Sequence, residues 1–276
     1  MPLDIEVEEI EMRLLLEGIH ARYGYDFRDY AQHSLSRRLK GALVRSGLPD
    51  YGALQHRVLT EPEIFASLVD DLTVQVSEMF RDPPFYRVFR EKVVPVLRTH
   101  PQIKIWHAGC AGGEELYATA IVLLEENLYD RAQIYATDMS MKAVEQAREG
   151  IYSEEQASLF AENYRRAGGQ GRFEDYYSSA YGRIAMHETL RRNAVFFQHD
   201  LVSDYALGEM QVVFCRNVMI YFSDKLRQRV LTVLGDGLRH GGFLCLGSSE
   251  RLPTSSLGGF AEFAPAERIY RRRGDA

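Results

Sequence analysis

Hydrophobic and polar positions alternate along the chain with two different periods. In the N-terminal part, apolar side chains recur three and four positions apart, which predicts amphipathic helices. We expect these helices over residues 5–23, about 30–46 and about 61–72. Gly24 follows the first helix and Gly47 the second, as is usual where helices end. The pattern predicts a helical N-terminal domain with its linker over residues 1–89, the linker being about 72–89.

From about residue 90 onward, short runs of branched and aromatic side chains alternate with helical segments, which predicts a mainly parallel sheet with helices on both faces. We expect strands at residues 103–106, 134–138, 195–201, 210–215 and 243–246, with an edge strand near 267–271. Gly241 and Gly242 are expected to end a helix over 224–240. Residues 151–194 interrupt the alternation, and their weak period of two predicts a small antiparallel β insertion. Residues 90–276 are therefore expected to form one α/β domain that contains this insertion.

A dense set of glycines follows the strand expected at 103–106. Gly109, Gly112 and Gly113 separate it from a helix whose apolar side chains share one face. Glycine allows the backbone to turn sharply and to lie close to a ligand. Asp138 closes the next strand, where an acid is placed to accept hydrogen bonds from ribose hydroxyls. The pattern predicts a nucleoside-like ligand at the carboxyl end of the sheet.

Glu114 and Glu115 begin the helix after the glycines, and they decide which ligand we expect. A dinucleotide sets its pyrophosphate against backbone amides at such a helix start, and two carboxylates there would repel it. They suit a ligand with an ammonium and a sulfonium group, which describes S-adenosylmethionine. The missing GxGxxG pattern also disfavours a nicotinamide-dependent oxidoreductase. A simpler interpretation is that each acid only favours the helix dipole, but the nearby glycines and Asp138 favour the ligand.

The bulk composition limits the remaining classes of protein. The 276 residues, 46% hydrophobic and 26% charged, suffice for one large or two smaller globular domains. The net charge of −6 argues against general nucleic-acid affinity. Three cysteines without CxxC spacing predict a reducing compartment and no metal site. The N-terminus does not resemble a signal peptide, and no apolar run approaches the ~20 residues of a membrane helix. We expect a cytoplasmic protein without direct membrane insertion.

The helix expected at about 30–46 carries four cations, Arg37, Arg38, Lys40 and Arg45. Such a run is most often a solvated helix face. In an otherwise acidic protein it is also suited to dock an acidic partner. The residue pattern alone leaves both interpretations open.

Four segments resemble the CheR family of chemotaxis-receptor methyltransferases. GCAGGEELYA, which begins at Gly109, is similar to the family's glycine motif. ATDMSMKAVEQAREGIY, which begins at Ala136, is similar to its ATD segment, and TVQVSEMFRDP, which begins at Thr73, to its linker. CRNVMIYF, which begins at Cys215, is the most specific match. The resemblance extends over nearly the whole chain, and four motifs in the family's order make chance a poor explanation.

The resemblance implies a class I SAM-dependent methyltransferase fold, Rossmann-like, with a small all-helical N-terminal domain and an antiparallel insertion. It implies methyl transfer from S-adenosylmethionine to glutamate side chains of a chemoreceptor-like protein, with S-adenosylhomocysteine as product. The acceptor would be the cytoplasmic helical region of the receptor, docked by Arg37, Arg38, Lys40 and Arg45. The cofactor contacts would be Gln75, Ser77, Arg81, Glu114, Asp138, Asp200, Leu201, Arg216 and Asn217.

A glutamate carboxylate is already ionised near neutral pH, so it needs no general base to attack a sulfonium methyl group. We therefore expect catalysis by alignment of the reacting atoms in a desolvated pocket. Arg81, Arg216 and Tyr221 are the candidates for orienting the incoming carboxylate. For Tyr221, a core tyrosine with a satisfied hydroxyl is an equally good interpretation.

The chain departs from the family pattern at four polar positions, Gln75, Ser77, Gly112 and Asp200. Gln75 replaces Asn, Ser77 replaces Thr, Gly112 removes a hydroxyl, and Asp200 replaces Asn. The departures at Gln75, Gly112 and Asp200 support an alternative function: a catalytically weak module that binds S-adenosylmethionine or S-adenosylhomocysteine as a sensory or scaffolding partner. The oligomeric state stays open.

Overall fold

The computed structural model describes residues 6–73, 77–253 and 259–274. The chain divides into two compact units. The first comprises the described residues of Met1–Val74 together with Asp200–Tyr205 and Tyr221–Val230, and the second comprises the rest. The domain boundaries expected from the sequence stay a prediction. Within the described ranges, no helix is both long and apolar enough to cross a membrane.

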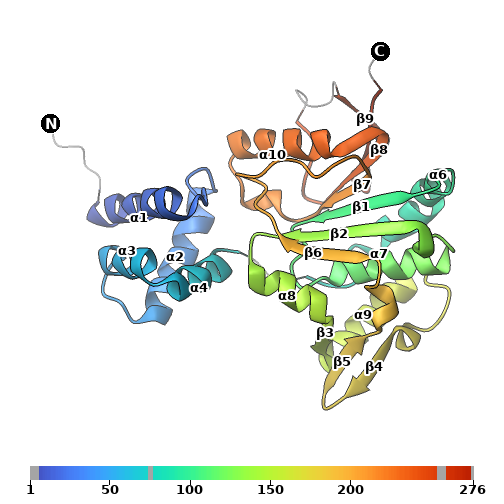
Figure 1. Cartoon of the computed structure of the whole chain (residues 1–276), viewed down its shortest axis with the longest axis horizontal. Coiled ribbons are helices and arrows are strands. Elements are labelled where there is room, and N and C mark those ends of the chain that lie inside the picture. Colours follow the sequence, from blue (N-terminus) through green and yellow to red (C-terminus); the bar gives the residue numbers. More distant parts are fainter. Residues whose placement is uncertain (1–5, 74–76, 254–258, 275–276) are drawn as a thin grey trace. The chain divides into compact units, whose positions relative to one another are not determined.

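Four helices build most of the first unit (Figure 1). They are α1 (Val7–Tyr23), α2 (Gln32–Ser46), α3 (Tyr51–Thr60) and α4 (Pro62–Leu72). The two glycine stops are confirmed, because Gly24 and Gly47 take left-handed backbone angles at the ends of α1 and α2. Sequence reasoning missed α3, which Asp50 caps by accepting a hydrogen bond from the Ala53 amide.

A seven-stranded sheet of order β6-β2-β1-β7-β8-β10-β9 forms the centre of the second unit (Figure 1). Its strands are β1 (Ile103–Ala108), β2 (Ala132–Asp138), β6 (Ala194–Gln198), β7 (Met210–Cys215), β8 (Leu238–Leu246), β9 (Phe260–Ala264) and β10 (Ile269–Arg272). The strands from β6 to β8 pair in parallel, and β10 runs antiparallel to both of its neighbours. The predicted mainly parallel sheet is confirmed. The expected edge position of the strand near 267–271 was wrong, because β10 lies between β8 and β9, and the edge strand β9 was not predicted.

The helices include α5 (Pro83–Val88), the π-helix η1 (Phe89–Val93), α6 (Val94–Leu97), α7 (Glu114–Glu125), α8 (Met141–Glu149) and α10 (Asp224–Gly237). The predicted end of the last helix was wrong, because α10 ends at Gly237 and residues 241–242 lie inside β8. Glycine is needed there for close approach: a Cβ at Gly242 would lie 2.9 Å from the Arg239 carbonyl oxygen and 3.0 Å from that of Met210. Pro83 and Pro84 begin α5, a position that proline favours.

The expected antiparallel insertion is present as a three-stranded sheet of order β3-β5-β4. Its strands are β3 (Ile151–Ser153), β4 (Tyr177–Ala180) and β5 (Arg183–Met186). The insertion also contains α9 (Glu154–Arg166), which the sequence pattern did not reveal. Ser153 and Gln156 form a capping box at its start.

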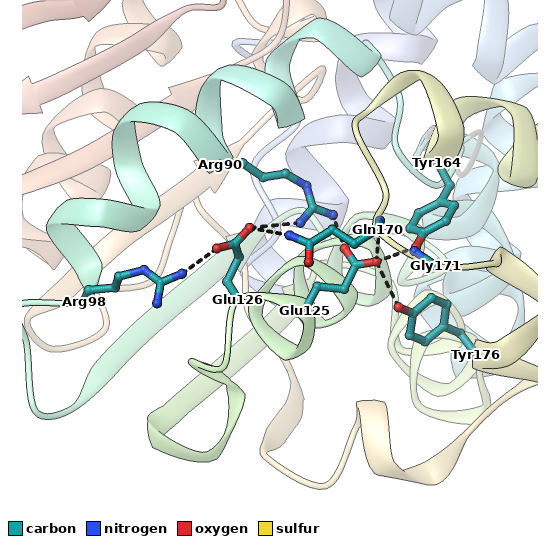
Figure 2. A network of polar contacts seen from close by, with 8 residues as sticks. All are labelled: Arg90, Arg98, Glu125, Glu126, Tyr164, Gln170, Gly171 and Tyr176. Carbon is teal, nitrogen blue, oxygen red and sulfur yellow. Dashed lines mark hydrogen bonds and ion pairs between the residues drawn. The ribbon is translucent and has the colours of Figure 1, made fainter.

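A buried carboxylate connects this insertion to the C-terminal end of α7 (Figure 2). Glu125 forms an ion pair with Arg90 of η1 and accepts hydrogen bonds from the Tyr164 and Tyr176 hydroxyls and from the backbone amide of Gln170. The side chains of Arg90 and Glu125 are only 8% and 6% exposed. Such a shared, desolvated acceptor fixes the insertion more firmly than any exposed ion pair would.

Candidate functional site

The candidate site lies at the carboxyl ends of β1 and β2, which pair in parallel from Ile103 with Ala132 to Ala108 with Thr137. The turn after β1 requires glycine at two positions. Gly109 and Gly113 have φ angles of 81° and 89°. A Cβ at Gly109 would lie 2.5 Å from Val218 Cγ2, and one at Gly113 would lie 2.9 Å from the Ala147 Cα. The turn can therefore pass close to its neighbours only without side chains.

Glu114 is the first residue of α7 and is only 2% exposed. Burial raises the pKa of its carboxyl to about 7, although a hydrogen bond from Ser77 opposes this shift. Its Oε2 atom has no hydrogen-bond partner among the described residues. A buried carboxyl oxygen without a partner is costly, and an ammonium group would satisfy it.

Gly112, the departure from the family pattern in this turn, lies directly beneath the Glu114 carboxyl. A Cβ at position 112 would lie 2.9 Å from Glu114 Oε1. The Gly112 carbonyl accepts a hydrogen bond of 2.7 Å from the Tyr152 hydroxyl. The missing side chain therefore leaves the space that the Glu114 carboxyl uses.

Asp138 ends β2 and ties the two strand ends together. Its Oδ2 accepts from the Ala111 amide and its Oδ1 from the Ser140 amide, both at 3.0 Å. An acid at the end of this strand is placed to accept hydrogen bonds from ribose hydroxyls. Asp138 thus has a structural role in holding the glycine turn, which sequence reasoning did not foresee.

Arg216 is the centre of a buried ion cluster, with a side chain only 3% exposed. Its Nη1 lies 3.0 Å from Glu115 Oε2 and its Nη2 lies 2.8 Å from Asp82 Oδ2. Burial alone would raise the pKa of Glu115, but the hydrogen bond from His107 and the charge of Arg216 lower it. Burial likewise opposes the charged form of Arg216, but Glu115, Tyr86 and Asp82 together outweigh it and raise the pKa of the guanidinium. Glu115 is therefore ionised and structural, unlike its neighbour Glu114.

Glu250 is a site residue that sequence reasoning missed. Its carboxylate accepts backbone hydrogen bonds from Asn217 at 2.8 Å, Met219 at 2.8 Å and Gly247 at 2.7 Å. Asn217 has a left-handed φ of 62°, which this carboxylate helps to hold. The available signal was an acid just after the end of β8, in the same kind of position as Asp138. Glu250 thus positions the segment that carries Arg216 and Asn217.

Three of the expected site residues belong to the first unit and are placed only within it. Asp200 accepts from the Val202 amide at 2.9 Å and from the Ser203 hydroxyl at 3.0 Å, so it organises its own turn as an acceptor. Leu201 is buried. The ring of Tyr221 lies 4.6 Å from the Arg38 guanidinium. Another expected contact, Gln75, lies outside the described residues.

The four cations of α2 differ in how far they are already engaged. Arg38 donates to the Leu72 carbonyl at 2.8 Å, Lys40 pairs with Glu8 at 3.0 Å, and Arg45 pairs with Asp71 at 2.6 Å. Arg37 is exposed. The pairs of Lys40 and Arg45 are largely solvated, so an acidic partner can exchange with them at little cost.

The donors present fit S-adenosylmethionine. Glu114 offers a buried oxygen for an ammonium group, Asp138 offers acceptors for ribose hydroxyls, and the glycines leave room for a ligand against the backbone. Among the described residues, no group of three or more His, Cys, Asp or Glu side chains is suited to hold a metal ion. Sheet order, glycine turn and paired acids define a class I SAM-dependent methyltransferase.

Family comparisons agree with this class. The model described as CheR methyltransferase, SAM binding domain, matches residues 75–263. The model described as CheR methyltransferase, all-alpha domain, matches residues 10–73. The chain belongs to the CheR methyltransferase family, and its cofactor is S-adenosylmethionine.

Similar proteins extend over almost the whole chain. A putative methyltransferase, Cher3, of Pseudomonas putida is 45% identical over 96% of this chain and 97% of its own length. The chemotaxis protein methyltransferase Cher2 of the same organism is 32% identical over 80% of this chain and 82% of its own length. A chemotaxis protein methyltransferase of Vibrio parahaemolyticus is 30% identical, with coverage of 90% and 91%.

Proposed function

We propose that this protein transfers the methyl group of S-adenosylmethionine to glutamate side chains in the cytoplasmic helical region of a chemoreceptor. Membership of the CheR family and the chemotaxis methyltransferases among its relatives support this substrate class. The observation that carries the proposal is Glu114, a buried carboxyl with an unpartnered oxygen beside a glycine turn. The protein would act in the cytoplasm, where that part of a receptor lies.

Cofactor binding would use one carboxylate at the start of α7 and another at the end of β2. Glu114 would accept hydrogen bonds from the ammonium group, with Ser77 holding its carboxyl in place. Asp138 would accept from the ribose hydroxyls. Asp200 and Leu201 remain the sequence-based candidates for contact with the adenine, and Asn217 remains a candidate for closing the pocket. S-adenosylmethionine, when bound, supplies an electrophilic methyl group on a sulfonium.

The protein's own residues would act on the acceptor mainly by orientation. A glutamate carboxylate is ionised near neutral pH, so no group needs to remove a proton from it. Arg81 is the best candidate to orient it, because no described residue forms a hydrogen bond or ion pair with its guanidinium. Tyr221 is the second candidate. The buried surroundings of Glu114 and Arg216 would exclude water, which strengthens both charge interactions.

Docking of the acceptor would use α2. Arg37 is exposed, and the exposed ion pairs of Lys40 and Arg45 can exchange with carboxylates of a receptor helix. Arg38 is more deeply involved in its own unit through Leu72 and Tyr221.

Methyl transfer from methyl-labelled S-adenosylmethionine to a receptor cytoplasmic fragment tests the proposal. We expect incorporated label that mild base releases as methanol, because glutamyl methyl esters hydrolyse readily. A matched fragment with its methylation-region glutamates changed to alanine should take up no label. Cofactor binding without any transfer, to receptors from the same cell, would instead favour the sensory or scaffolding module.

A further inference from the structure

Arg81 lies between two residues with unusual backbone angles. Phe80 has a φ of 54° and Asp82 a φ of 57°, both in the left-handed region. Side chains other than glycine rarely adopt these angles, and bulky ones such as Phe least of all. Strained residues of this kind persist only where the surrounding structure holds them. Two sets of contacts hold the turn Phe80–Asp82.

The first set is packing around Phe80, which is fully buried. Its ring meets Tyr86 at 5.1 Å and Tyr164 at 5.3 Å, both edge to face. Burial of this ring on its own fixes one end of the turn. It does not fix the direction in which Arg81 leaves it.

The second set consists of hydrogen bonds that Arg216 donates to the other end of the turn. A single nitrogen, Nη2, lies 2.8 Å from Asp82 Oδ2 and 3.3 Å from the Arg81 carbonyl oxygen. The guanidinium is itself fixed by Glu115 at 3.0 Å and by the Phe85 ring, whose centroid lies 4.1 Å away. Both terminal nitrogens of Arg216 therefore have partners within the protein, whereas its buried Nε has none among the described residues.

We propose that Arg216 is a positioning residue, which holds Asp82 and the Arg81 carbonyl so that the strained turn presents the Arg81 guanidinium to the acceptor carboxylate. The inference rests on the proposed function only where it assigns Arg81 to the acceptor. In this role Arg216 acts through Arg81, and the sequence-based expectation that it also contacts the cofactor stays a prediction. The Glu115 carboxylate, which is hydrogen-bonded to His107, forms an ion pair with Arg216 and stabilises its positive charge.

Three substitutions at Asp82 separate the ion pair from the backbone angle. Asp82→Gly accepts the left-handed angle freely but removes the ion pair. Asp82→Asn tolerates the angle and keeps a neutral acceptor for Arg216. Asp82→Ala removes the ion pair with Arg216 and also disfavours the left-handed backbone angle. We expect kcat for methyl transfer to fall about 100-fold in the Gly and Ala variants, as for a misplaced reacting group. The Asn variant should recover most of that loss, with the cofactor KM nearly unchanged in all three.

A second readout does not depend on activity. Hydrogen exchange at the Arg81 and Phe85 amides should be faster in Asp82→Gly and Asp82→Ala, because these amides donate to Glu78 and Asp82 within the turn. Affinity for S-adenosylhomocysteine should change by less than about threefold, well under the tenfold that 1.4 kcal/mol gives. Asp130→Ala removes an exposed ion pair with Arg192 in the same unit and should change neither readout.

These outcomes distinguish the positioning role of Arg216 from the proposed function of the protein. A Gly variant with wild-type kcat and wild-type exchange would overturn the role of Arg216, because the ion pair would then be dispensable. Failure of the wild-type protein to methylate any receptor fragment would reject the proposed function. The exchange experiment would still decide, in that case, whether Arg216 holds the turn.

Discussion

Replacing Glu114 by glutamine should stabilise the cofactor-free protein at alkaline pH. Burial raises the pKa of this carboxyl from 4.5 to about 7 in the folded protein. Below pH 4.5 the folded and unfolded forms are both protonated, so the shift has no effect on stability. As the pH rises from about 4.5 to 7, the unfolded chain releases the proton first, and the free energy of unfolding falls. Above about pH 7 the loss is complete.

The magnitude follows from the size of the shift. Each pKa unit corresponds to about 1.36 kcal/mol, so the full penalty at pH 8 is about 3 kcal/mol. Glutamine has nearly the same shape and never ionises, so Glu114→Gln should recover most of this amount. For a unit of this size, about 3 kcal/mol raises the thermal midpoint by about 6–12 °C. At pH 5 or below, wild type and variant should unfold at similar temperatures.

Thermal unfolding of the cofactor-free wild type and variant at pH 5 and pH 8 measures the difference. Glu115→Gln is the matched control in the adjacent position. Its carboxylate already pairs with His107 and Arg216, so its loss should destabilise the protein at pH 8. A Glu114→Gln variant that is no more stable than wild type at pH 8 would refute the argument, because the carboxyl would then be solvated.

Three further outcomes are expected. Affinity for S-adenosylhomocysteine should rise from about pH 6 to 8, because its ammonium group binds the ionised form of Glu114. Calorimetry in buffers of different ionisation enthalpy should detect the release of a proton on binding. An affinity that does not depend on pH would contradict this prediction. Glu125→Gln should lower the free energy of unfolding by about 3 kcal/mol through the loss of its buried ion pair with Arg90. The control Glu162→Gln, on the exposed face of α9, should leave the free energy of unfolding unchanged. Equal effects of the two substitutions would contradict a stabilising role of the Glu125 contacts. Arg37→Glu should raise the acceptor KM about tenfold at low salt and less at high salt, with cofactor affinity unchanged; an unaltered KM would make α2 only a solvated face.

Local pattern was sufficient for much of the fold. Gly24 and Gly47 ended helices where expected, and Asp138 ended its strand where expected. The helix ends are determined by residues nearby in the sequence, and the position of Asp138 is determined by the end of a single strand. The helices α3 and α9 were missed although local signals mark their starts, the Asp50 cap of α3 and the capping box of Ser153 and Gln156 at α9. Gly242 was misassigned because its requirement is a close approach to a different strand, at Met210, which no local pattern contains.

The site was predictable in its chemistry and less so in its contacts. The types of residue at Glu114 and Asp138 indicated a nucleoside with an ammonium group. The pattern did not indicate that Asp138 also holds the Ala111 amide, nor that Glu250 holds the segment after β7. The ion pair of Asp82 with Arg216 joins residues 134 positions apart, so it depends on the tertiary fold.

The central claim is that Glu114 binds the amino group of S-adenosylmethionine and that Asp138 binds its ribose. A crystal structure with S-adenosylhomocysteine tests it most directly. We predict that the ligand amino nitrogen lies about 2.7–3.2 Å from a Glu114 carboxyl oxygen and that the ribose hydroxyls lie at the same distance from Asp138. A ligand bound elsewhere, or one whose amino group and ribose face other residues, would contradict the claim.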